Sequence, residues 1–428
     1  GDTLYQRDLN RYVRMQADTT ATAKVYLPNP LVTAQKEYGK PYWNNDGASN
    51  KGLKQQRQQV TMPVSIAGSD SFVLQSPQVR IAEFSAPDKP ITFARKPQFY
   101  FSRDTAAFEQ VNTYYHINRF HQHLQELGLG KLIDYQVPVD AQALSGRDNS
   151  KFSQSGNSKE GRLYFGEGGI DDGEDAEIVV HEYGHAISAA ASPGSYIGNA
   201  ETEGLEEGFC DYLACSYARY LSSYNWERLF SWDAGVRSNK QNKFWSGRWC
   251  TTDQQYPESI DSDIYSNGEI WAGTFMDVWE DLGRDVTDQL VLTALSSFSS
   301  SMTMQDGAQL VLQADSLLFE GKYNQTLRMI LNNRGLIDDS ELGVNQSSAS
   351  ETWNPSASYH KGKFRIQLKR PHKNLQVTLQ TLNGKIIQTA TNPGQTTIQL
   401  RANNLARGIY LIRLQTTKYQ EALKVVKP

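Results

Sequence analysis

The spacing of apolar residues changes several times along this chain. Before about residue 100, apolar and polar positions alternate in short runs interrupted by glycine, proline and an Asn-Asp-Gly turn, which predicts strands and loops. From about Thr105 to Gly128, apolar residues recur every three or four positions, the period of an amphipathic helix. Helical periods return at 288–298, 303–319 and 324–333, and short alternating runs return beyond residue 363.

These changes predict an α+β protein with four parts. Residues 1–100 form a β-rich region, and residues 101–336 form a core of strands and helices that ends in a helical lobe. Residues 337–362 have the polar composition of a linker. Residues 363–428 are predicted to be a separate small antiparallel β-sandwich, in which Asn383-Gly384 is typical of a hairpin turn.

Composition narrows the class of protein without identifying it. At 428 residues the chain is long enough for two or three domains, and 39% hydrophobic with 21% charged residues is typical of a globular protein. The net charge of −4 argues against nucleic acid as a partner, and no apolar run is long enough to span a bilayer. The polar first residues do not resemble a signal peptide. Three cysteines, Cys210, Cys215 and Cys250, allow at most one disulfide bridge.

The stretch from His181 to His185, with the sequence His-Glu-Tyr-Gly-His, carries the most specific chemistry. It lies in a segment that is apolar nearly all round, from Ile178 to Ala190, which predicts a buried helix. Two histidines four residues apart on a helix project from the same face, so both rings can bind one metal ion. Zinc suits neutral imidazole, and Glu182 would lie beside a zinc-bound water as its general base.

A third ligand is expected from the next helical segment. Glu207 and Asp211 are one helical turn apart and follow His185 after a short connection. This spacing allows Glu207 to bind the metal while Asp211 orients a ligand histidine through its other ring nitrogen. With three protein ligands, a fourth position stays open for water, as in catalytic zinc sites. The Glu-x-x-x-Asp spacing favours Glu207 over three carboxylates that compete by residue type: Glu201, Glu203 and Glu206.

Other polar residues are expected to have supporting roles. Residues 148–152 and 162–169 predict a strand or hairpin leading into the zinc helix, and an edge strand there could hold an extended peptide by backbone pairing. Asn149 and Glu167 are the candidate substrate-binding residues of this hairpin. A structural or surface role is expected for three histidines of the 105–128 helix, which have no carboxylate partner nearby in sequence: His116, His121 and His123.

The motifs resemble the thermolysin-like metallopeptidases, and within them the fungalysin family most closely. The His-Glu-Tyr-Gly-His stretch matches the fungalysin zinc motif, and Glu207-Gly-Phe-Cys-Asp211 resembles the Glu-Gly-Trp-Ser-Asp segment of that family. Gly268-Glu-Ile-Trp-Ala272 resembles its Gly-Glu-x-Trp-Ala segment. The resemblance covers roughly residues 100–335. It implies a thermolysin-like zincin fold in which Glu207 is the third zinc ligand and Asp211 supports a ligand histidine.

The resemblance also assigns roles around the substrate. Gly235-Val-Arg237 resembles a Gly-Ile-Arg of the family, so Arg237 is expected to hold a substrate carbonyl. Fungalysins carry a histidine that stabilises the oxyanion three positions before the glycine of Gly-Glu-x-Trp-Ala, and here that position is Tyr265. No histidine falls between residues 186 and 359. A tyrosine hydroxyl can donate the same hydrogen bond, as in aminopeptidases of the wider superfamily, so Tyr265 is the expected oxyanion residue.

The end of the chain resembles the C-terminal sorting domain of the type IX secretion system of Bacteroidetes-type bacteria. The matching segments are Asn404-Leu-Ala-Arg-Gly-Ile-Tyr-Leu-Ile412 and the terminal Lys424-Val-Val-Lys427. The resemblance implies export across the outer membrane, to the medium or the cell surface, with the type IX machinery as a partner. An all-β accessory domain without that role is the alternative.

Together these features predict a secreted zinc endopeptidase that acts as a monomer on peptide or protein substrates, through a zinc-bound water activated by Glu182. An aminopeptidase is the alternative enzyme, with Glu167 as a candidate for binding the free amine. A surface binding protein with structural zinc is the alternative from another class, which a closed four-ligand site would favour. The sequence leaves open whether calcium is also bound by one or more of four acidic residues: Asp171, Asp172, Asp175 and Glu177.

Overall fold

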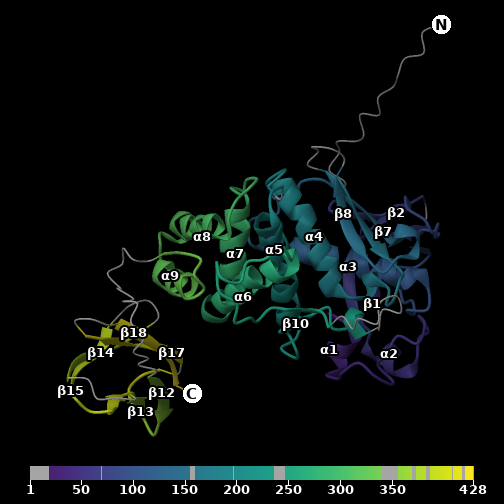
Figure 1. The fold of residues 1–428 in the computed structure, drawn as a ribbon. Coiled ribbons are helices and arrows are strands. Elements are labelled where there is room, and N and C mark those ends of the chain that lie inside the picture. Colours follow the sequence, from purple (N-terminus) through teal and green to yellow (C-terminus); the bar gives the residue numbers. More distant parts are fainter. Residues whose placement is uncertain are drawn as a thin grey trace. The chain divides into compact units, whose positions relative to one another are not determined.

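The computed structural model describes residues 19–68, 70–154, 160–195, 197–235, 246–338, 355–368, 373–381, 386–406, 408–416 and 420–427. The chain divides into two compact units, Gly1–Val311 and Leu312–Pro428, and the boundary falls inside helix α8, Met304–Phe319. The first unit mixes helices and sheets; the second contains helix α9, Asn324–Asn333, and an all-β domain (Figure 1). The predicted mixture of helices and strands and the all-β C-terminal domain are therefore confirmed.

Most of the described strands before about residue 100 form one five-stranded sheet, as the alternation predicts. The two long strands pair antiparallel, and side chains of the first strand alternate between buried and more exposed positions, the period of a half-buried sheet. Two short helices, α1 (Pro30–Ala34) and α2 (Lys51–Gln56), follow asparagine N-caps. The sheet has the order β5-β3-β2-β1-β6, with the bounds β5 Phe93–Ala94, β3 Ser71–Val73, β2 Gln58–Ala67, β1 Thr19–Val25 and β6 Gln98–Phe99.

A second, four-stranded sheet leads into the metal-site helix. Its order is β4-β7-β9-β8, and the bounds are Val79–Ile81, Val137–Ala143, Gly161–Gly166 and Ser150–Gln154. The first three strands run parallel, whereas β8 pairs antiparallel with β9 from Ser150 opposite Phe165 to Gln154 opposite Gly161. The predicted hairpin is thus confirmed, and β8 is an edge strand in the described part of the sheet. An edge strand leaves one side of its backbone free to pair with another chain.

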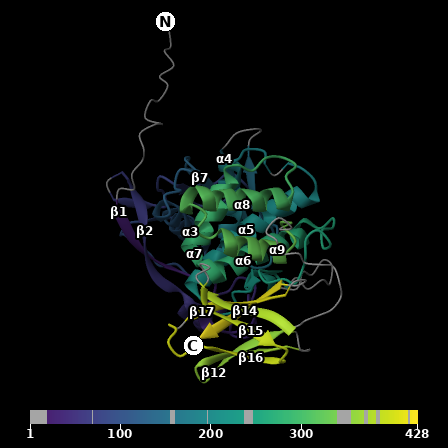
Figure 2. The same cartoon turned by 90° about the vertical axis from the view of Figure 1, so that its left-hand side faces the viewer.

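Helices of the first unit bring distant parts of the chain to this sheet. Helix α3 packs against β4 and β7, and α4 packs against β8 and β9 (Figure 1). Helix α5 packs against α4 and also against α6, which lies beside it in Figure 2. A short antiparallel pair, β10 (Arg228–Leu229) and β11 (Arg248–Trp249), follows α5. The helix bounds are α3 Ala106–Glu126, α4 Ala176–Ala191, α5 Ala200–Leu221, α6 Ile264–Leu282 and α7 Arg284–Leu295.

The three histidines of α3 are buried and serve the packing of the helices. His123 Nε2 lies 2.7 Å from Asp288 on α7, and Asp288 also accepts hydrogen bonds from Tyr212 and Ser216 of α5. A buried carboxylate with this many partners is satisfied, and it ties three helices together. His116 and His121 contact the hydroxyls of two further buried tyrosines, Tyr217 and Tyr183.

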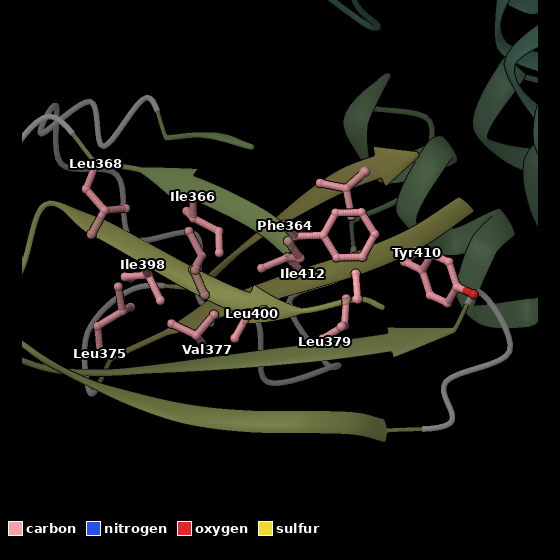
Figure 3. Packing of buried hydrophobic residues seen from close by; sticks show 13 residues of the cluster. Phe364, Ile366, Leu368, Leu375, Val377, Leu379, Ile398, Leu400, Tyr410 and Ile412 are labelled. Carbon is pink, nitrogen blue, oxygen red and sulfur yellow. The ribbon is translucent and has the colours of Figure 1, made fainter. Parts of the chain in front are cut away.

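The C-terminal domain is a sandwich of two antiparallel sheets. One sheet has the order β12-β13-β16, with bounds Ser356–His360, Lys363–Gln367 and Thr397–Arg401. The other has the order β15-β14-β17-β18, with bounds Ile386–Pro393, Lys373–Thr381, Gly408–Gln415 and Gln420–Lys427. Figure 3 shows the core between them, where Phe364 and Leu400 from one sheet face Leu379 and Ile412 from the other. The predicted hairpin turn at Asn383-Gly384 lies outside the described residues.

Candidate metal centre and active-site cleft

Three residues from two helices converge where α4 packs against the N-terminal half of α5. His181 and His185 lie one turn apart on α4, and their Nε2 atoms are 3.2 Å from each other. Glu207 on α5 presents Oε2 at 3.4 Å from His181 Nε2 and Oε1 at 3.7 Å from His185 Nε2. These are the three residues that the spacing of the sequence motifs selects as metal ligands.

Their geometry fits a tetrahedral metal ion. Ligand atoms about 2.0–2.1 Å from a tetrahedral zinc ion lie about 3.3 Å from one another. The three separations of 3.2, 3.4 and 3.7 Å are close to that value, before any ligand moves. The donor set, two imidazoles and one carboxylate, is the one found in catalytic zinc sites and leaves a fourth position for water or substrate. The residues present therefore fit the metal that the motifs imply.

Glycines explain how the helices come close enough. A Cβ atom built on Gly184 of α4 would lie 3.0 Å from Cys210 Sγ and 3.2 Å from Cys210 Cα on α5. A Cβ atom on Gly208 of α5 would lie 2.4 Å from the carbonyl oxygen of Gly268 on α6. A larger residue at Gly208 would thus push α5 and α6 apart. Gly208 directly follows Glu207 in the sequence, and Gly184 lies on the helix that carries both histidines, so these two close contacts help to set the position of the Glu207 ligand.

Two carboxylates contact the far nitrogens of the histidine rings. Asp211 Oδ1 lies 2.8 Å from His181 Nδ1, as the sequence predicts. Glu206, the residue before Glu207 in the sequence, places Oε1 at 3.1 Å from His185 Nδ1. It therefore supports the ligand His185. Such partners hold the ring orientation and keep Nε2 available for the metal.

Arg248 of β11 was not predicted from the sequence, and it lies beside the site. Its Nη1 atom is 3.0 Å from Glu207 Oε2 and 2.8 Å from Asp211 Oδ1. The guanidinium also lies over the Tyr265 ring, 4.2 Å from its centroid. No local pattern links β11 to α5, since their contact depends on the tertiary fold. Its glycine and tryptophan neighbours offer no motif that singles out this arginine.

The charges around the ligands act on the carboxylates in opposite directions. Burial alone would raise the pKa of Glu207, but His181, His185 and Arg248 together hold that pKa well below its usual range. Burial raises the pKa of Glu182 above its ordinary value, and the two histidines offset only part of that rise. A metal ligand must stay ionised, and a proton acceptor must be basic enough to take up a proton. The lowered pKa of Glu207 suits the first role, and the raised pKa of Glu182 suits the second.

A cleft of about 1040 Å³ opens beside these groups. Glu182 and the metal-ligand residues line it, together with residues of β8 and with Asn149, which immediately precedes that strand. Tyr265 lies in the first turn of α6, lines the same cleft and is 46% exposed. The cleft therefore brings the candidate base, the metal ligands, the edge strand and the candidate oxyanion residue together.

Of the other predicted substrate residues, Glu167 does not line this cleft and Arg237 lies outside the described residues. Glu167 follows the end of β9, does not line the cleft, and forms an ion pair with Lys89 at 3.0 Å. Arg237 lies outside the described residues, so its predicted contact with a substrate carbonyl stays a prediction.

The four acidic residues considered for calcium do not gather into one ligand group. Asp175 caps α4 by accepting the Glu177 backbone N–H, and Glu177 itself accepts the Phe230 backbone N–H. The other two belong to separate carboxylate groups in the described part of the chain, Asp171 with Glu109 and Glu174, and Asp172 with Asp148 and Asp233. Calcium binding by one or more of these four residues stays a prediction.

The sequence is similar to known metallopeptidases, as the candidate metal site would suggest. Residues 33–339 match the family model for the fungalysin metallopeptidases (M36), and residues 354–428 match the model for a secretion system C-terminal sorting domain. The chain is also similar to the protein named Extracellular metalloproteinase mep of Aspergillus terreus, with 23% identity over 303 residues. That alignment spans 61% of this chain and 44% of the relative, so the chain covers less than half of the length of that curated protein.

Replacement of Glu207 by glutamine tests the ligand set. We expect Glu207→Gln to weaken retention of the metal by more than the roughly 10- to 100-fold that is typical of losing an outer partner, because a neutral amide replaces a charged ligand. The measurement is elemental analysis of the purified chain after dialysis against a weak chelator. Glu203→Gln, an exposed position on the same helix, is the control and should keep full metal content. Full metal content in Glu207→Gln would move the ligand role to Glu206 or Glu203.

Proposed function

The chain belongs to the fungalysin metallopeptidase family, and on that premise we propose that it is a secreted zinc endopeptidase. The observation that carries the proposal is the convergence of His181, His185 and Glu207, with separations of 3.2–3.7 Å, in a cleft that Glu182 also lines. Metal binding is a property of the family, and zinc is the ion that this donor set suits best.

Glu182 is the proton acceptor in this proposal. When bound, the metal polarises the scissile carbonyl and lowers the pKa of a water molecule. Glu182 lies one residue from His181, and its Oε2 atom has no hydrogen-bond partner among the described residues. It can therefore accept a proton from that water and pass the proton to the nitrogen of the leaving amine.

The edge strand and Tyr265 position the substrate. An extended peptide can pair with the open edge of β8, next to Asn149, which places its backbone along the cleft. The Tyr265 hydroxyl can then donate a hydrogen bond to the carbonyl oxygen as negative charge develops there. Arg248 contacts both Glu207 and the Tyr265 ring, and its positive charge favours the same developing charge. The aminopeptidase alternative loses its candidate residue, since Glu167 does not line the cleft.

We further propose that the core has a thermolysin-like arrangement. Three features support it: a mixed sheet with an edge strand along the cleft, a buried helix that carries both histidines, and a following helix that carries the third ligand. The helices of the first unit after residue 264, α6 and α7, would belong to the second lobe.

The C-terminal sandwich directs export in this proposal. Its match to a secretion system sorting domain covers residues 354–428, which include every strand of the sandwich. The type IX machinery would recognise this domain, and the peptidase would act outside the cell. No helix in the described part of the chain is long and apolar enough to cross a membrane.

Hydrolysis of blocked peptides tests the proposed chemistry. The parent chain should cleave peptides whose two ends are acetylated and amidated, which an aminopeptidase would not. Glu182→Gln should abolish cleavage while retaining the metal, because the proton acceptor is lost. Tyr265→Phe removes only a hydroxyl and should lower kcat by about 10²–10³, the usual effect of removing one oxyanion donor.

Tyr220→Phe is the matched control for that series, since its ring is exposed and does not line the cleft. It should cleave at the parent rate. Parent-like cleavage by Tyr265→Phe would make Tyr265 a packing residue. A metal-loaded parent that cleaves none of a broad peptide library would instead favour the binding-protein alternative.

Export is tested by removing the matched sorting segment. A chain that ends at Trp353 should retain the metal but stay inside the outer membrane of a bacterium that carries the secretion system. As a complementary measurement, residues 354–428 fused to an unrelated periplasmic reporter should bring the reporter to the medium or cell surface. Normal export of the shortened chain, or a reporter that stays in the periplasm, would contradict the sorting role.

A further inference from the structure

One face of α5 lies along β11 in a defined register. Glu207, Asp211 and Cys215 are spaced four residues apart on α5, so they share one face of that helix. Arg248 begins β11 and Cys250 directly follows its last residue, and alternate residues of an extended segment point to the same side. Four residues of helix advance about 6 Å and two residues of strand about 6.6 Å, so the two spacings match.

The contacts follow this register. Arg248 lies against Glu207 and Asp211, at 3.0 and 2.8 Å. One step further along both segments, the side chains of Cys215 and Cys250 lie next to each other. Both cysteines are completely buried, and neither is bridged in this structure.

Two hydrogen bonds of the neighbouring segment hold the cysteines in place from the other side. The Cys250 backbone N–H donates to the Glu227 carbonyl oxygen at 2.8 Å, and Cys215 Sγ donates to the Trp226 carbonyl oxygen at 3.4 Å. The third cysteine, Cys210, is five residues from Cys215 and therefore on another face of α5, where it packs against Gly184 of α4. Cys250 thus has Cys215, and not Cys210, as its neighbour.

We propose that Cys215 and Cys250 form a disulfide in the exported protein and thereby anchor the segment that carries Arg248 to the face of α5 that carries Glu207 and Asp211. The inference rests on the export proposed above, since an oxidising compartment is where such a bond persists. The β10–β11 ladder pairs only two residues of each strand, and a ladder that short holds its strands weakly. A covalent link two residues from Arg248 would keep its guanidinium between the two carboxylates.

The bond forms by thiol–disulfide exchange. One cysteine thiolate attacks the disulfide of a thiol oxidant, such as a periplasmic oxidoreductase or oxidised glutathione, and displaces one of its thiolates. The second cysteine then attacks the mixed disulfide, so that one S–S bond forms in the protein and the oxidant leaves as two thiols. Two electrons and two protons pass from the cysteines to the oxidant. Burial raises the pKa of both thiols in the folded chain, so little thiolate is present there to react. The exchange therefore takes place during folding, before the segment that carries Cys250 packs against α5.

Thiol mapping of the full-length chain tests the proposal without reference to peptidase activity. The chain is recovered from the culture medium, or from the periplasm if export fails, then unfolded without reductant, alkylated and digested. We expect alkylation at Cys210 alone, and a linked pair of peptides that contain Cys215 and Cys250 and together weigh two hydrogen atoms less than the separate peptides. Alkylation of all three cysteines would overturn the proposal, as would a link that includes Cys210.

Variants and a stability measurement give independent controls. Cys210→Ala should keep the linked pair, whereas Cys215→Ser should lose it and leave Cys250 open to alkylation. A phosphine reductant should lower the midpoint of thermal unfolding of the parent by roughly 4–15 °C, as expected for loss of one disulfide, and should leave Cys215→Ser unchanged. An equal effect of the reductant on both chains would contradict a stabilising bridge between these two residues.

Discussion

The close contact between α4 and α5 is the constraint on which the site depends. At Gly184 the two backbones approach so closely that an added Cβ atom would lie 3.0–3.2 Å from Cys210, closer than ordinary van der Waals contact. This approach brings the Glu207 carboxylate to 3.4 and 3.7 Å from the two imidazoles and lets Asp211 and Glu206 reach the far side of the rings. The sheet, the edge strand β8 and helix α6 then surround a centre whose geometry the two helices already determine.

The same contact creates an electrostatic problem that the surrounding residues resolve. Carboxylates buried beside one another are unfavourable unless positive groups compensate them. Arg248 supplies a positive charge between Glu207 and Asp211, and a metal ion held by His181, His185 and Glu207 would supply more. Arg248 thus supports a ligand and its neighbour at once, which explains why the anchoring of β11 bears on the metal centre.

Much of the site could be predicted from the sequence because its ligands follow local helical periods. The four-residue spacings of His181 with His185 and of Glu207 with Asp211 each place two groups on one helix face, and the structure brings the two pairs together. Arg248, Glu206 and the Cys215–Cys250 pair were not assigned to these places, since their contacts arise only when separate segments pack. Glu167 was placed wrongly because the edge strand is β8, whereas Glu167 follows the inner strand β9 and turns toward Lys89. The sandwich was predictable from alternation alone.

X-ray absorption spectroscopy at the zinc edge of the full-length, zinc-loaded chain tests the central claim most directly. The account predicts a shell of nitrogen and oxygen ligands at about 2.0–2.1 Å. Two nitrogens come from imidazoles, one oxygen comes from Glu207, and a further oxygen comes from a water molecule at the open position. A competing group of described residues, His185, Glu206 and Cys210, would instead bind through a thiolate. A zinc–sulfur distance of about 2.3 Å, or a closed shell of four protein ligands, would contradict an open metal centre formed by His181, His185 and Glu207.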